Sequence, residues 1–134
     1  MSWFGESTTP TTHRAVLEVL ADGHFMRKGS RTLLAEDYIM KDADGNRYLY
    51  PGLIIAEDTA GTYYLVFSDS TSYGTNSDVA VGVLREFHNA TLGDPIIDPI
   101  VHGKLIEAHC YEYEGTFGTI SAGVKTELTL VEWV

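Results

Sequence analysis

Turn-forming residues divide this chain of 134 residues into short apolar segments. The uninterrupted apolar runs, such as residues 53–56, fall far short of the ~20 residues that cross a bilayer as a helix. Instead, about six segments combine β-branched and aromatic residues with turn residues at their ends, which is typical of strands. The pattern therefore predicts an all-β or mainly β protein, a small β-barrel-like or β-sandwich-like domain, and excludes a membrane protein.

Length and charge narrow the classes of function. A chain of this size forms one domain. Nineteen Asp and Glu against nine Lys and Arg give a formal net charge of -10, so the molecule repels a nucleic-acid backbone and we expect no direct binding to DNA or RNA. The single cysteine, Cys110, cannot form an internal disulfide, and no secretory signal opens the chain. Both features predict synthesis and folding in a reducing cytoplasm.

The clearest strand predictions lie in the middle of the chain. Residues 42–46 are rich in Asp, Gly and Asn and predict a turn, and strand-like segments follow over residues 48–57 and 62–67. Residues 79–84 alternate between Val and other small or apolar residues, which predicts a strand buried on both faces. Within that strand, Gly82 implies a close backbone approach or a bend.

The second half of the chain predicts further extended structure. Asp-Pro pairs at residues 94–95 and 98–99 force extended or turning backbone, which excludes a helix there. Residues 100–113 predict one or two strands around Gly103, with alternate side chains on opposite faces. A final strand is predicted over residues 126–134.

The start of the chain differs from the rest. Residues 1–12 are polar except for Trp3 and Phe4 and show no periodicity, so we predict a flexible N-terminal arm in front of a single domain over residues 13–134. Two large aromatic residues on such an arm suggest a surface against which it docks. A frayed end that packs weakly on its own domain explains them as well.

Two neighbouring segments leave alternatives open. Residues 13–20, with Thr12 as a cap, fit a short helix and a strand equally well, and Asp22 and Gly23 are expected to end the element. Residues 27–31 are basic in an otherwise acidic chain. They predict either an exposed turn or a contact with an acidic partner.

No set of residues predicts catalysis, a metal site or a cofactor. Asp42 begins a calcium-loop spacing, but Arg47 replaces the required glycine and Leu53 the required glutamate. His109 precedes Cys110 on a predicted strand, where neighbours face opposite sides, so Cys110 is expected to be a small buried hydrophobe and not a nucleophile. No two histidines have metal-ligand spacing; they are His13, His24, His88, His102 and His109.

Tyrosines form two same-face pairs, Tyr48 with Tyr50 and Tyr111 with Tyr113. Aromatic faces stack on sugars, which makes a carbohydrate-binding module the alternative function. Cross-strand aromatic packing explains the same pairs without a ligand.

The order of four segments is more informative than any polar cluster. Residues 51–54, 62–67, 79–84 and 100–108 are, in this order, a glycine-led strand, a short strand, the sequence Val-Ala-Val-Gly-Val-Leu and the sequence Ile-Val-His-Gly-Lys-Leu-Ile-Glu-Ala. This order resembles the lambda-like bacteriophage head decoration proteins. The similarity covers residues 51–111, and its most specific parts are the blocks around Gly82 and Gly103.

The resemblance implies a capsid decoration protein that binds the outer surface of the expanded phage head and stabilises it. Members of that family are usually homotrimers that hold neighbouring copies of the major capsid protein together, and their N-terminal arms become ordered on the shell and add a strand to a capsid subunit. The expected location is therefore the virion. The negative charge suits an outer surface that does not touch the packaged genome.

Mapped onto this sequence, the resemblance places capsid contacts on the arm and on the segment that follows it, and it suggests a trimer contact on the second tyrosine pair. The implied capsid-binding residues are Trp3, Phe4, Thr12, Arg14, Val16, Leu17 and Val19. The implied trimer contacts are Tyr111 and Tyr113. The chain departs from the family in its longer segment over residues 27–50 and in its ending around Trp133.

Overall fold

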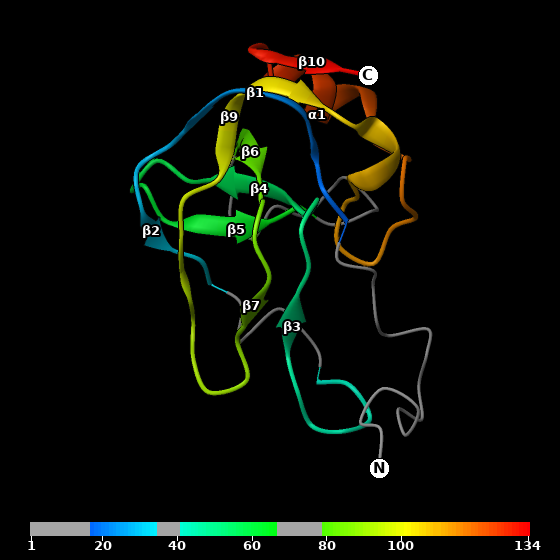
Figure 1. The fold of residues 1–134 in the computed structure, drawn as a ribbon. Helices are drawn as coiled ribbons and strands as arrows, with labels where there is room; N and C mark the ends of the chain where they lie inside the picture. The colour runs from blue at the N-terminus through cyan, green and yellow to red at the C-terminus, as the bar shows by residue number, and fades with distance from the viewer. Residues whose placement is uncertain (1–16, 35–40, 67–78) are drawn as a thin grey trace.

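A computed structural model describes residues 17–34, 41–66 and 79–134 of the chain (Figure 1). Strands dominate these residues, accompanied by one 3₁₀ helix and one short α-helix. The prediction of a mainly β protein is confirmed. The elements are β1 (Leu20–Arg27), β2 (Arg31–Thr32), β3 (Tyr48–Leu49), β4 (Ile54–Glu57), β5 (Tyr63–Leu65), β6 (Val79–Val83), β7 (His88–Asn89), β8 (Ile96–Ile97), β9 (Ile100–Leu105), η2 (Glu107–His109), α1 (Ala122–Glu127) and β10 (Val131–Trp133).

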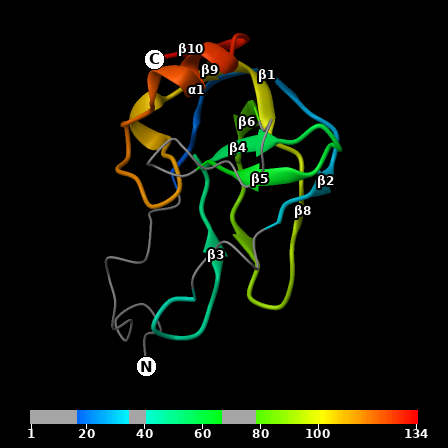
Figure 2. The same ribbon diagram turned by 180° about the vertical axis from the view of Figure 1, so that it is seen from behind.

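The main sheet has the strand order β1-β9-β6-β4-β5, and β10 pairs with β9 in parallel. All its other pairings are antiparallel. Two small ribbons, β2 with β8 and β3 with β7, complete the described strands. Figures 1 and 2 show α1 and β10 at one end of the molecule and the β3–β7 ribbon at the opposite end.

The segment through β1 and β2 runs antiparallel to the segment through β8 and β9. Between the strands, the amides of Lys28 and Leu33 donate to the carbonyls of Pro99 and Pro95, each at 2.9 Å. Both Asp-Pro pairs are thus extended, as predicted. At the far end of this ribbon, Leu33 meets Tyr63 of β5 through one isolated bridge and no ladder, so the sheet stays open and the arrangement is sandwich-like.

Strand β4 separates two hydrophobic cores, because its successive side chains point to opposite sides. Ile55 and the preceding Leu53 face what we call the aromatic core, while Ile54 and Ala56 face the aliphatic core. The aromatic core consists of Leu33, Leu49, Tyr50, Leu53, Ile55, Tyr63, Leu65, Leu84, Ala90, Ile97 and Tyr111. The aliphatic core consists of Val19, Leu20, Ile54, Ala56, Val66, Ala80, Val83, Ile100, Leu105, Cys110, Val124 and Leu128.

Two glycines permit close backbone crossings. Gly52 has φ +98°, and a Cβ there would overlap the carbonyl oxygen of His109. A Cβ on Gly82 would lie 2.6 Å from the carbonyl oxygen of Ile100, where β6 passes β9. The close approach predicted at Gly82 is therefore confirmed, although β6 is not buried evenly because Val79 is exposed.

The turn at residues 42–46 is also confirmed. The amide of Gly45 donates to the carbonyl of Asp42 at 3.0 Å, and Asp42 Oδ1 accepts the amides of Asp44 and Asn46, each at 2.9 Å. Asp is common at the start of a turn because its carboxylate can accept the backbone amides of the turn in this way.

Strand β1 corrects the expectation that Asp22 and Gly23 end an element. The strand instead passes through both residues, and the register shifts between the pairs Leu20–Leu105 and Phe25–Gly103. The extra residues bulge outward, and Asp22 Oδ1 accepts the amide of His24 at 3.0 Å. A bulge lets a strand continue past residues that ordinarily interrupt it.

The strands predicted over residues 100–113 and 126–134 are shorter than expected. After β9 the chain forms the 3₁₀ helix η2, so Glu107 and His109 are not strand residues on one face. Helix α1 occupies Ala122–Glu127, and only β10 remains as a final strand. A contact distant in sequence stabilises the start of this helix: the buried carboxylate of Glu112 accepts the amide and the hydroxyl of Ser121 at 2.9 and 2.5 Å.

Candidate functional site

The predicted capsid-binding residues fall into two groups. Only Leu17 and Val19 are among the residues that the structure describes; Trp3, Phe4, Thr12, Arg14 and Val16 lie outside them. Leu17 is partly exposed, but Val19 is fully buried in the aliphatic core, and its carbonyl accepts the amide of Ile106 at 2.8 Å. Because its side chain is used inside the domain, Val19 offers no side-chain surface to a capsid in this fold.

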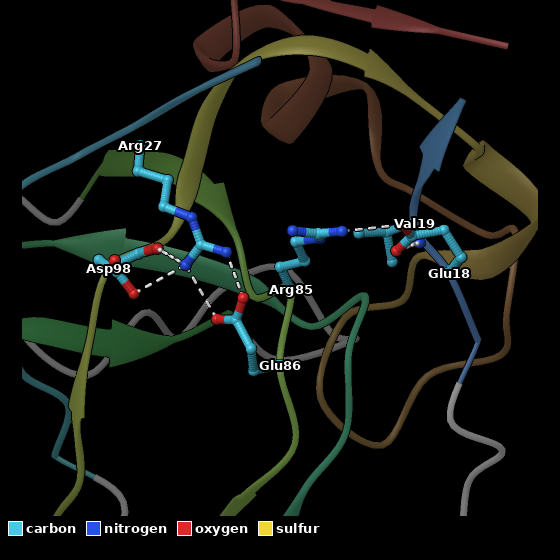
Figure 3. A network of polar contacts seen from close by, with 6 residues as sticks. All are labelled: Glu18, Val19, Arg27, Arg85, Glu86 and Asp98. Carbon is cyan, nitrogen blue, oxygen red and sulfur yellow. Dashed lines mark hydrogen bonds and ion pairs between the residues drawn. The ribbon is translucent and has the colours of Figure 1, made fainter. Parts of the chain in front are cut away.

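Residues 17–19, which we call the root, connect the preceding segment to the domain. Around Glu18 the contacts come from distant parts of the chain (Figure 3). Arg85 donates to Glu18 Oε1 at 3.0 Å, and His109 Nδ1 donates to the Glu18 carbonyl at 2.7 Å. The hydrogen bond from Arg85 lowers the pKa of the Glu18 carboxyl, partly opposed by its desolvation. The root is thus held by the β6–β7 connection and by η2.

A second arginine lies in the same network. Arg27, at the end of β1, donates to both carboxylate oxygens of Glu86 and to Asp98 Oδ1 (Figure 3). This hydrogen bonding with Glu86 raises the pKa of Arg27 and lowers that of Glu86, in each case against desolvation. The ring of Phe25 lies against both guanidinium groups, 5.7 Å from that of Arg27 and 5.2 Å from that of Arg85. The two arginines therefore share one aromatic ring.

The basic segment over residues 27–31 connects β1 to β2, as the turn interpretation predicts. Its charges have partners within the chain: Lys28 and Arg31 lie 3.5 and 3.6 Å from the carboxylate of Glu57. The hydroxyl of Tyr63 donates to the carbonyl of Gly29 at 2.6 Å, which fixes the turn against the aromatic core. An acidic partner is therefore not needed to explain this segment.

The first tyrosine pair forms an aromatic cluster with a residue from the neighbouring strand segment. The ring centroids of Tyr48 and Tyr50 are 6.3 Å apart, and each lies 5.3 Å from that of Phe87. The β3–β7 pairing brings the three together. The rings thus pack on one another in the edge and tilted arrangements that aromatic pairs favour.

The second pair does not form one surface. Tyr111 is only 3% exposed, its hydroxyl donates to the carbonyl of Tyr50 at 3.1 Å, and its ring packs on Phe117 at 5.2 Å. A side chain that is buried in its own chain offers no area to a second copy, so Tyr111 is corrected from a trimer contact to a core residue. Tyr113 is partly exposed and packs at the edge of the aromatic core.

Cys110 is buried, as predicted, and its thiol donates to the carbonyl of Ile106 at 3.4 Å. Burial, with a smaller contribution from Glu107, raises the pKa of Cys110 to about 12, so the thiol is neutral at pH 7. His109 does not approach it as a base but donates to the root. This pair therefore lacks the chemistry of a cysteine nucleophile.

The described residues contain neither a metal-binding cluster nor a membrane-spanning helix. No group of three or more His, Cys, Asp and Glu among residues 17–34, 41–66 and 79–134 could hold a metal ion. In the same part of the chain, no helix is long and apolar enough to span a membrane. Comparison of the chain with protein-family models, with curated proteins and with solved structures gave no match.

No local sequence pattern indicates the residues around the root. Glu18 and Arg85 are 67 positions apart, and Arg27 is 59 and 71 positions from Glu86 and Asp98. Such ion pairs lack a local spacing, and only the folded sheet brings them together.

Proposed function

We propose that this protein is a bacteriophage capsid decoration protein, which binds the outer surface of the expanded head as a homotrimer and stabilises the contacts between major capsid protein subunits. In this role it is not an enzyme and needs no cofactor, and its location is the virion. The proposal combines the segment order over residues 51–111 with the described fold.

The observation that carries the proposal concerns the three glycines of that segment order. Gly52 and Gly82 lie at crossings that exclude a side chain, and Gly103 has φ +147° with its ideal Cβ 2.9 Å from the carbonyl oxygen of His24. Each glycine is therefore required for the pairing or crossing of segments in and beside the main sheet. This supports the view that the resembling pattern reflects a fold constraint and not chance similarity of small apolar residues.

The surface of the described residues is also compatible with binding to a protein shell. Several large apolar side chains are exposed on different elements: Met26, Val79, Phe87, Leu92, Ile96, Leu130 and Val134. Interfaces between protein subunits need such side chains at their centres. With Tyr111 buried, these residues, Tyr113 and the partly exposed Leu17 are the described candidates for the trimer and capsid contacts.

The test is to mix the purified protein with expanded capsids that lack it, pellet the shells and count bound copies against capsid subunits. We expect saturable binding at a fixed symmetric ratio and a higher melting temperature of the shells. Absence of binding to any related capsid would refute the proposal. Light scattering that shows a monomer at all concentrations, with no trimer on capsids, would refute its trimeric part alone.

A deletion tests the role of the N-terminal segment. Removal of residues 1–12 should leave the circular dichroism spectrum of the domain unchanged, because all described elements begin after this segment. Binding to capsids should become weaker, because the two aromatic residues of the segment are lost. Unchanged binding would show that the arm carries none of the affinity.

The carbohydrate-binding alternative depends on free aromatic faces. Of the three rings in the Tyr48, Tyr50 and Phe87 cluster, only Phe87 is strongly exposed, at 42%. Mutual packing explains the cluster without a sugar, so the capsid role is the function we propose. A glycan array run beside the pelleting assay would detect a sugar preference that capsid binding does not predict.

A further inference from the structure

The root is held to the rest of the domain by several contacts, although part of it is exposed. Val19 already attaches it to the domain through burial in the aliphatic core and through the hydrogen bond with Ile106. Beyond that point Glu18 is exposed, yet Arg85 binds its side chain and His109 binds its backbone carbonyl. These two contacts act on the residue at which the chain leaves the core.

The ion pair at this position adds little to the stability of the domain. Both side chains are substantially exposed, and exposed ion pairs contribute little to folding. What the two contacts do is restrict the backbone of Glu18, because its carbonyl and its carboxylate are held by different parts of the fold. The direction in which the chain continues toward its N-terminus is thereby limited.

The arginine in this contact is itself held in place. Its guanidinium lies 5.2 Å from the ring of Phe25, whose other guanidinium neighbour, Arg27, is bound to Glu86 and Asp98. An Arg that is fixed before it binds loses less side-chain entropy when it does so. Arg85 is therefore arranged to bind Glu18 in one orientation (Figure 3).

We propose that Arg85 and His109 are positioning residues for capsid binding: they fix the exit direction of the N-terminal segment at Glu18, so that this segment meets its site on the capsid subunit at a higher effective concentration. The inference rests on the proposed function. Restriction of the free state before binding raises affinity by reducing the entropy lost on association. Neither residue needs to touch the capsid.

The test compares two substitutions of equal charge in the full-length protein. Arg85→Met removes the root ion pair, whereas Lys28→Met removes the ion pair with Glu57 at the β1–β2 connection; the side chains are 34% and 37% exposed. We expect Arg85→Met to weaken capsid binding about two- to fivefold, the range that exposed ion pairs support, and Lys28→Met to leave it unchanged. Arg85→Lys should restore most of the affinity.

A second readout does not involve capsids. ¹⁵N relaxation should show lower backbone order at Leu17 and Glu18 in Arg85→Met than in the wild type or in Lys28→Met. His109→Gln, which keeps a donor, should change this order less than His109→Ala. Equal order in all variants would overturn the inference, because the root would then be fixed without these residues.

A double-mutant cycle separates positioning from direct contact. In a full-length protein with Trp3→Ala and Phe4→Ala, Arg85→Met should have no further effect on capsid binding, because the segment that it positions no longer contributes affinity. An equal loss in both backgrounds would show that Arg85 touches the capsid itself and would overturn the inference. If the wild type fails to bind, the proposed function is refuted together with the inference, whereas wild-type binding that Arg85→Met does not alter refutes the inference alone.

Discussion

The two hydrophobic cores differ in how they connect to the rest of the molecule. The aromatic core contains tyrosines whose hydroxyls bond to backbone carbonyls of distant segments: Tyr63 to Gly29 and Tyr111 to Tyr50. The aliphatic core has no comparable hydroxyl; it is covered by helix α1 and by the root, through Val124 and Val19. The aromatic core therefore fixes turns by hydrogen bonds from side-chain hydroxyls, whereas the aliphatic core holds the start of the described chain by burial of the Val19 side chain.

This difference explains the two corrected site residues. A tyrosine in a β-rich chain resembles a surface residue, but Tyr111 is buried because its hydroxyl has a partner. A valine next to a polar segment resembles part of that segment, but Val19 is buried because it packs in the aliphatic core, which includes Ile100 and Leu105 of β9. In both cases the partner lies far away in sequence.

The largest effect is expected where the two cores meet. Gly52→Ala places a methyl group against the carbonyl of His109 at a positive φ, which should cost about 2–6 kcal/mol of the free energy of unfolding. Both cores should lose packing contacts, because η2 is pushed away from the start of β4. Urea denaturation measures the loss, and Gly93→Ala, where a Cβ meets no atom within 4 Å, is the control. Equal stability of the two variants would contradict the crossing.

A matched pair on β4 separates the cores. Ile54 and Ile55 are both fully buried but face the aliphatic and the aromatic core respectively. Replacement of either by Ala should destabilise the domain by about 2–5 kcal/mol, through lost burial and a residual cavity. In a Trp3→Phe background, fluorescence of Trp133 reports on the aliphatic core, and near-ultraviolet circular dichroism reports on the tyrosines. If the two probes give the same unfolding midpoint in both variants, the cores unfold together. If the probes give different midpoints, the cores unfold as independent units.

The hydrogen bonds from tyrosine hydroxyls in the aromatic core provide a more specific test with a smaller expected effect. Tyr63→Phe and Tyr111→Phe keep the rings and remove one donor each, which should lower the free energy of unfolding by about 0.5–1.5 kcal/mol. Tyr63→Phe should also increase amide exchange in the turn around Gly29, whereas Tyr111→Phe should not. If neither variant changes stability, the hydroxyls do not distinguish the two cores.

Features of this fold that depend on local sequence signals were predictable, whereas features that depend on contacts outside a segment were not. The central segments that became β4, β5 and β6, the turn at residues 42–46 and the close approach at Gly82 were predictable, because side-chain alternation, turn residues and a lone glycine are local signals. Helix α1 was missed because part of its stabilisation comes from Glu112, outside the helix. The ion pairs of Arg27 and Arg85 were missed because their partners are brought together only by the sheet.

The smallest expected effect concerns the charged network on the surface beside the aliphatic core. The pKa values of Glu86 and Glu18 are lowered from the ordinary value of 4.5, first of all by hydrogen bonds from Arg27 and Arg85. A carboxyl with a lowered folded-state pKa contributes stability that is fully present above its unfolded value and is lost as the pH falls through its folded value. The free energy of unfolding should therefore decrease as the pH falls from about 5, by about 1 kcal/mol or less for each exposed pair.

Substitution of the arginine isolates this contribution. In Arg27→Met, Glu86 loses the donor that lowers its pKa, so the decrease in stability below pH 5 should be shallower than in the wild type. Lys28→Met removes the same charge but leaves Glu86 and Glu18 with their partners, and it should keep the wild-type slope. Urea midpoints measured between pH 6.5 and pH 3.5 give the comparison. Identical slopes for Arg27→Met and the wild type would mean that the ion pair between Arg27 and Glu86 does not contribute to the stability of the fold in this pH range.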